Sequence, residues 1–251
     1  MNKKMIEHLN QSNFNDFIIF MIFRSKYWKK FTIDCSTGLE FYNKQQKLEL
    51  RIPNDIDINI KNKDNVEKLI LEIFFEYKQN LHIEFGETRE PVNNKNTLTQ
   101  KIKITFQTEK EKLKAEIDLS YEQKKFKKVQ LRTKLFDEDL VVQIYTIEKY
   151  LANKLLASWK KGNKTKKEKS LFDIWFILNN YQINKNTLND NFNLMNNIDI
   201  NIDDVLKNLI KEIKEQHQNY INLFTEFFEQ HKVNYEAGEF ISMLLEKLIN
   251  F

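Results

Sequence analysis

Hydrophobic and polar residues alternate with period two through much of the first half of the chain. In the segment 55–60, DIDINI, three isoleucines share one face and two aspartates share the other, which is the pattern of a half-buried strand. Alternation or short apolar runs predict strands in 31–34, 47–60, 81–85, 101–107 and 113–121. A short charged turn separates the last two segments and predicts a hairpin.

Helical periodicity marks other parts of the chain. Residues 1–30 are expected to be helical, with the apolar run 17–23 buried, and 65–79 carries an amphipathic pattern. From Thr146 onward the pattern is helical to the C-terminus. We therefore expect an α+β fold with an α+β lobe at residues 1–142 and an α-helical lobe at residues 143–251.

The amino-acid composition is that of a folded globular protein. The 251 residues are 41% hydrophobic and 30% charged, as in folded globular proteins. The single cysteine, Cys35, excludes an intramolecular disulfide and fits a reducing cytoplasm, and the apolar run 17–23 is too short to cross a membrane. The net charge of +4 permits a nucleic-acid partner without requiring one. The four histidines are scattered, so we interpret them as structural or surface residues.

Three aspartates carry the candidate chemistry. Asp55 and Asp57 project from one strand face, and like charges so close repel each other unless a proton or cation lies between them. Asp118 lies on another predicted strand, with Ile117 and Leu119 facing the core. Carboxylates in this arrangement suit two Mg²⁺ ions, which can bridge the attacking and leaving oxygens of a phosphoryl displacement.

Five motifs in order give the chain a family resemblance. It resembles the AbiEii/AbiGii-type toxin nucleotidyltransferases of the DNA polymerase β-like superfamily, which carry Gly-Gly-Thr-Ala-Leu after a strand, then Arg-x-x-x-Asp-x-Asp and a third Asp. A helix with Glu-x-x-x-Ala-x-Lys-Leu and an Arg-Asp-x-x-Asp-Leu segment follow. The corresponding elements here are CSTGL (35–39), RIPNDID (51–57), Asp118, EKYLANKLLA (148–157) and KSLFDI (169–174).

The resemblance implies a nucleotidyltransferase lobe with a mixed β-sheet flanked by helices, followed by a helical lobe. It implies an enzyme that uses two Mg²⁺ ions, or Mn²⁺ in their place, to transfer a nucleotide from a nucleoside triphosphate to RNA, with transfer RNA favoured. It would act in the cytoplasm as the toxin of a toxin–antitoxin or phage-defence system, with a cognate antitoxin and no membrane association.

The resemblance also assigns roles to individual residues. Asp55, Asp57 and Asp118 would ligate the metals, and Asp118 would also help to activate the attacking hydroxyl. The remaining predicted residues are Ser36 and Thr37, which would hold the triphosphate; Lys154, which would reach it; Asp173, which would orient Lys154 or the acceptor; and Arg51, which would steer phosphate or brace the strand. Because Asp173 lies in an apolar helix, a cationic partner is expected for it.

Two departures from the family pattern keep other functions open. Cys35 and Ser36 replace the glycine pair, and Ser170 replaces the first aspartate of the last motif. A catalytically inactive relative that binds RNA or a protein is therefore an alternative, and a structural protein with chance matches is another. The lysine run 160–169 is either a solvated loop or an RNA-backbone contact.

Overall fold

The computed structural model describes residues 3–46, 55–61, 63, 65–90, 98–121, 124–159, 167–196 and 201–251. The chain divides into two compact units, Met1–Tyr145 and Thr146–Phe251. The division therefore follows Tyr145, where the last strand ends, rather than residue 142. The identity of the first unit as the catalytic lobe stays a prediction.

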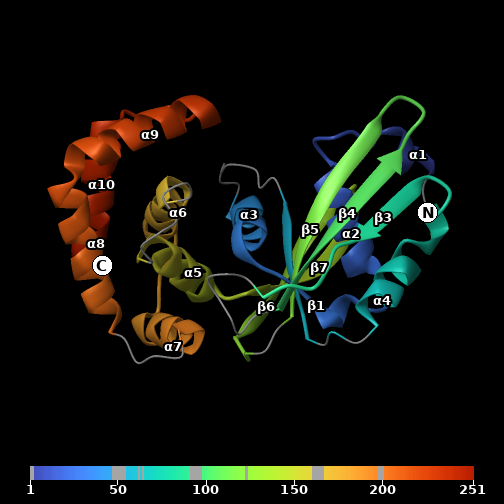
Figure 1. Cartoon of the computed structure of the whole chain (residues 1–251), viewed down its shortest axis with the longest axis horizontal. Coiled ribbons are helices and arrows are strands. Elements are labelled where there is room, and N and C mark those ends of the chain that lie inside the picture. The colour runs from blue at the N-terminus through green and yellow to red at the C-terminus, as the bar shows by residue number, and fades with distance from the viewer. Residues whose placement is uncertain are drawn as a thin grey trace. The chain divides into compact units, whose positions relative to one another are not determined.

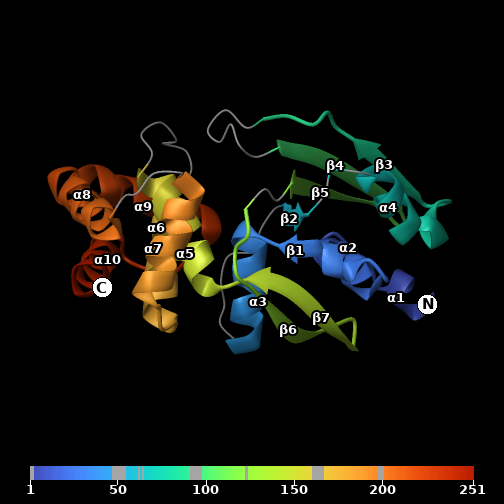
Figure 2. The same ribbon diagram turned by 90° about the horizontal axis from the view of Figure 1, so that it is seen from below.

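The first unit is built on a seven-stranded mixed sheet with the order β3-β4-β5-β2-β1-β7-β6 (Figures 1 and 2). Strands β5 and β2 are parallel, as are β1 and β7, and the other neighbours are antiparallel. The expected α+β class with a mixed sheet is confirmed. The strands are β1 Phe31–Ile33, β2 Ile56–Ile60, β3 Leu81–Phe85, β4 Leu98–Gln107, β5 Lys112–Tyr121, β6 Lys128–Leu135 and β7 Glu138–Tyr145.

Helices pack on this sheet and close its core. They are α1 Lys3–Glu7, α2 Phe14–Arg24, α3 Cys35–Gln46 and α4 Val66–Ile73, with short 3₁₀ turns η1 Trp28–Lys30 and η2 Phe75–Tyr77. Helix α2 packs against β5, β6 and β7, and every residue from Phe17 to Phe23 is buried. The apolar run is thus a core helix, as its pattern predicts.

The β6–β7 hairpin has no counterpart among the predicted strands. Its two-residue turn consists of Phe136 and Asp137, which both adopt positive φ values of 53° and 61°. Asn-Gly or Asp-Gly is the usual signature of such a turn because glycine accepts positive φ at little cost. Phe136 instead packs against Phe17 and Phe20. Tertiary packing, rather than local turn preference, therefore places Phe136 in this turn.

The second unit is entirely helical over its described residues. Its helices are α5 Ile147–Trp159, α6 Lys167–Asn180, α7 Lys185–Asn196, α8 Ile202–Glu215, α9 His217–His231 and α10 Ala237–Asn250. Helix α5 packs on α6 and α7, and an aromatic cluster centred on Phe240 joins α6, α9 and α10. None of the described helices combines the length and apolar character needed to cross a membrane.

Candidate active site

Asp57 and Asp118 are direct neighbours in the sheet. Strands β2 and β5 pair in parallel, with Asp57 opposite Asp118 in the register. Parallel strands lie about 4.8 Å apart, and paired residues point to the same face. Ile56 and Ile117 are buried, whereas both aspartates are partly exposed. The strands that carry the aspartates are therefore neighbours in one sheet.

Asp55 adds a third negative charge to this face. It precedes β2, two residues before Asp57, and is partly exposed. Partial burial is the largest cause that raises the pKa of Asp118, the ammonium of Lys101 opposes that rise, and the charge of Asp55 adds to it. The charge of Asp55 thus acts on Asp118 in the same direction as burial does.

The donor chemistry of this face fits a hard divalent cation. Mg²⁺ prefers carboxylate oxygens and takes its remaining ligands from water and phosphate. Within the described residues, no three Asp, Glu, His or Cys side chains form a metal-binding group as they lie. The ammonium Nζ of Lys101 lies 3.6 Å from Asp118 Oδ1, so a protein cation already shares this space. The aspartates thus offer suitable ligands, while their role as metal ligands stays a prediction.

The segment 35–39 begins helix α3 directly after β1, as its small residues predict. Asp34 bonds to the start of this helix, because its Oδ1 accepts a hydrogen bond from Cys35 N at 2.7 Å and its carbonyl accepts one from Gly38 N at 2.9 Å. Cys35 has φ of 47°, a left-handed conformation that favours glycine. The backbone therefore keeps a glycine-type conformation at a position where the resembled family has glycine.

Thr37 holds the start of β2 in place. Its side chain is buried, and its hydroxyl donates to the carbonyl of Asp55 at 3.2 Å and accepts from Asp57 N at 3.1 Å. These bonds use the hydroxyl to position the backbone of both aspartates. Ser36, in the first turn of α3, is more exposed. Contact of Ser36 and Thr37 with a triphosphate stays a prediction.

A buried polar network that no local sequence pattern predicts supports the same region. Asn59 Nδ2 donates to Asp34 Oδ2 at 2.9 Å and to Tyr145 Oη at 2.8 Å, which links β2, the end of β1 and β7. Asp34 N also donates to the carbonyl of Asp57 at 2.9 Å. The sequence feature that indicates this network is Asn59 itself, a polar residue on the aspartate face of the DIDINI strand.

Lys154 and Asp173 form an ion pair within the helical unit. Lys154 Nζ on α5 lies 2.7 Å from Asp173 Oδ2 on α6, and the side chains are 11% and 0% exposed. The expectation of a cationic partner for Asp173 is confirmed. Ser170, which replaces an acidic residue of the family pattern, is buried one turn earlier on α6. The predicted contact of Lys154 with phosphate stays a prediction.

Arg51 lies outside the described residues. The lysine run 160–169 lies partly outside them, since its residues 160–166 are not described. The last three residues of that run belong to the first turn of α6, where Lys167 forms an ion pair with Glu212. This described part of the run therefore stabilises a helix contact.

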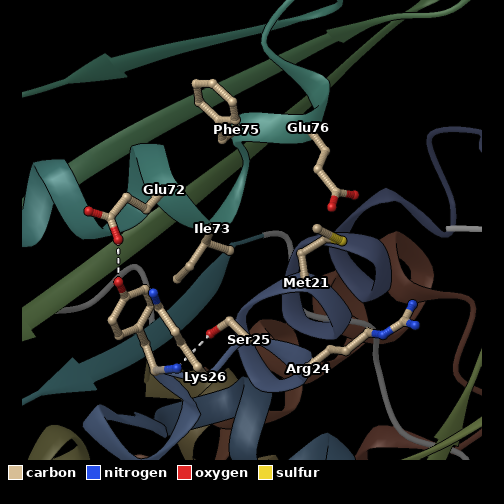
Figure 3. A pocket seen from close by; sticks show the side chains of 9 residues that line it. Met21, Arg24, Ser25, Lys26, Glu72, Ile73, Phe75 and Glu76 are labelled. Carbon is tan, nitrogen blue, oxygen red and sulfur yellow. Dashed lines mark hydrogen bonds between the residues drawn. The ribbon is translucent and has the colours of Figure 1, made fainter.

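A cavity of about 500 Å³ lies between the ends of α2 and α4 in the first unit (Figure 3). The hydroxyl of Tyr27 donates a hydrogen bond to Glu72 on its wall. The lining residues are Met21, Arg24, Ser25, Lys26, Tyr27, Glu72, Ile73, Phe75 and Glu76. None of the predicted site residues lines it, so the aspartate face, and not this cavity, defines the candidate active site.

Comparison with known proteins shows the family and the fold of the chain. Residues 42–240 match the model of the family described as nucleotidyl transferase AbiEii toxin, type IV TA system. The crystal structure of JHP933 from Helicobacter pylori superposes with a TM-score of 0.55 at 13% identity, covering 100% of this chain and 92% of that one. An antigenic nucleotidyltransferase-like protein from Paracoccidioides brasiliensis gives 0.50 at 11% identity, covering 84% and 93%. The search of curated proteins gives no match.

Proposed function

Because the chain belongs to the AbiEii family of nucleotidyl transferase toxins, we propose that it transfers a nucleotide from a nucleoside triphosphate to an RNA hydroxyl. Transfer RNA is the favoured acceptor, and divalent cations assist the reaction. The observation that carries the proposal is the register of β2 and β5, which sets Asp57 opposite Asp118. A toxin of this kind would be counteracted by a cognate antitoxin and would serve in phage defence.

The proposed reaction is an in-line displacement at the α-phosphorus. The acceptor oxygen forms a bond to phosphorus, the bond to pyrophosphate breaks, and the hydroxyl proton leaves the acceptor. Asp118 is suited to receive that proton, because its partly exposed carboxylate lies beside Asp57 on the aspartate face. Bound Mg²⁺ would neutralise phosphate charge, with Asp55, Asp57 and Asp118 as its protein ligands.

The remaining residues position these groups. Thr37 fixes the backbone of Asp55 and Asp57, so we assign it a positioning role in addition to the predicted place in the triphosphate segment. Ser36, with the first turn of α3, would contact the phosphates. Lys154 would bind the triphosphate while Asp173 holds its ammonium group in one orientation. Arg51 would contribute a further phosphate contact.

The departures from the family pattern support a second candidate, an inactive member that binds RNA or a partner protein. Cys35, Ser36 and Ser170 are its basis. The left-handed backbone of Cys35 argues for an active site, because the chain keeps the strained conformation without the glycine that would relieve it.

Label transfer separates the two candidates. The protein is incubated with total RNA and each of the four α-³²P nucleoside triphosphates, with Mg²⁺ or with EDTA. We expect one or more nucleotides to label a discrete RNA band only with Mg²⁺. Asp118→Asn should remove the label, whereas Asp139→Asn, which changes an exposed aspartate of β7, should not. Failure of every triphosphate to label RNA, together with retained RNA binding, would support the inactive module.

A further inference from the structure

Lys101 is built into the aspartate face from the neighbouring strand. It lies on β4 directly opposite Asp118 of β5 in the antiparallel register. Its Nζ is 2.7 Å from Glu116 Oε2 and 3.6 Å from Asp118 Oδ1. Glu116 and Asp118 are two residues apart on one strand and share a face, so a single ammonium group lies between their carboxylates.

The contacts of this ammonium are unequal. Lys101 is hydrogen-bonded to Glu116, and that bond is the largest cause of its raised pKa. The contact with Asp118 is an ion pair, and its length of 3.6 Å is too great for a hydrogen bond. Glu116 therefore provides an anchor that keeps the lysine beside the candidate metal ligand and gives it a partner when Asp118 binds another cation.

We propose that Lys101 sets the affinity of the aspartate site for its divalent cation. Its ammonium pairs with Asp118 until the ion arrives, and it keeps only its hydrogen bond with Glu116 when the ion binds. This inference rests on the proposed function, since it takes the aspartates to be the cation ligands. Lys101 is a positioning residue in this scheme, because it acts on the metal through Asp118 and Glu116.

Coulomb's law gives the size of the effect. The repulsion between a divalent ion and an ammonium group about 5 Å apart in water corresponds to roughly a tenfold change in binding constant. Salt at physiological strength screens part of this repulsion between exposed charges. Removal of the Lys101 charge is therefore expected to tighten cation binding by about three- to tenfold.

Lys103 offers a matched control on the same strand and face. It is opposite Glu116, two pairs along the ladder from Asp118, and it is exposed like Lys101. Lys101→Met and Lys103→Met each remove one positive charge from this strand and keep the length of the aliphatic side chain. Only the first removes the ammonium that contacts Asp118.

Mn²⁺ titration followed by the electron paramagnetic resonance signal of the free ion measures the affinity without catalysis. We expect Lys101→Met to lower the dissociation constant three- to tenfold and Lys103→Met to change it by less than about twofold. The Lys101 effect should shrink as salt is raised, which a purely structural change would not produce. Melting in EDTA checks that each variant is folded.

Glu116→Gln is expected to change the Mn²⁺ affinity in the opposite direction. Without the Glu116 carboxylate, the Lys101 ammonium pairs with Asp118 alone, so Mn²⁺ binding should weaken. The decrease in Mn²⁺ affinity should be smaller when Lys101 is already Met. Equal dissociation constants for wild type, Lys101→Met and Lys103→Met would overturn the inference and leave the proposed function intact. Absence of Mn²⁺ binding by the wild type would overturn both.

Discussion

Lys154 Nζ lies 2.7 Å from Asp173 Oδ2, with the lysine side chain 11% exposed and the aspartate completely buried. Burial of two charges is costly, and only their mutual attraction and hydrogen bonding offset that cost. The pair joins α5 to α6, so it fixes the contact between these helices. It can also hold the ammonium in one orientation, which a phosphate-binding lysine needs.

Lys154→Met is expected to destabilise the protein by about 3–5 kcal/mol, because it removes the positive charge that pairs with the buried carboxylate of Asp173. Urea unfolding measures the change. The double variant Lys154→Met/Asp173→Leu should recover much of the loss, since an apolar pair needs no compensation. Lys207→Met, at an exposed ion pair with Asp204, should have little effect. A Lys154→Met protein as stable as the wild type would contradict the structural account of the pair.

Thr37→Val tests the positioning of the two aspartates. The substitution keeps the shape of the side chain and removes the hydroxyl that bonds Asp55 O and Asp57 N. We expect a loss of about 1–3 kcal/mol in unfolding free energy, together with slower RNA labelling. Thr37→Ser keeps the hydroxyl and should retain more of both. Equal behaviour of the two variants would show that the hydroxyl does not position β2.

The pKa of Asp118 predicts a pH dependence in the metal-free protein. Burial raises this pKa above the ordinary value of 3.8. A raised folded-state pKa contributes stability that is present below about pH 3.8 and is lost as pH rises through the folded pKa. In EDTA, the unfolding free energy of Asp118→Asn should therefore increase relative to that of the wild type as pH increases from 4 to 8. Unfolding at several pH values measures this gain, with Asp139→Asn as the control. A gap that narrows with rising pH would contradict the direction of the shift.

Cys35 tests the backbone at the start of α3. A left-handed conformation costs a residue with a side chain about 1–2 kcal/mol. Glycine avoids this strain, but it loses more conformational entropy on folding, which cancels part of the gain. Cys35→Gly should therefore be as stable as the wild type or slightly more stable, and should still label RNA. Cys35→Val, with a β-branched side chain, should be clearly less stable in the same melting experiment. The reverse order would mean that the positive φ carries no strain.

Local patterns predicted the elements whose signals lie within a few residues. The alternation in DIDINI and in 113–121 predicted strands β2 and β5 and the outward direction of their aspartates. The β6–β7 hairpin could not be predicted from turn residues, because Phe136 holds positive φ through its contacts with α2.

Contacts between distant residues needed the structure. The role of Thr37 depends on hydrogen bonds across 18 and 20 residues of chain. The position of Lys101 depends on the register of β4 against β5, since a shift by one residue would turn the lysine to the other face. Lys154 and Asp173 were predicted as partners because a buried carboxylate requires one, and the motif order supplied the candidate.

Asp57→Asn tests the central claim that the aspartates form a nucleotidyl-transfer site. Asparagine keeps the shape of the side chain and removes one charge from a face where Asp55 and Asp118 already repel each other. The folded protein in EDTA should therefore melt at or above the temperature of the wild type. Loss of an anionic ligand should remove both Mg²⁺-dependent stabilisation and catalysis.

The decisive measurement is the rate of ³²P transfer from the preferred nucleoside triphosphate to RNA by Asp57→Asn and wild type, at equal concentrations of protein shown to be folded. We predict labelling by the wild type and a loss of at least about a hundredfold in the variant. Labelling by Asp57→Asn at a rate close to that of the wild type would contradict the assignment of this face as the active site.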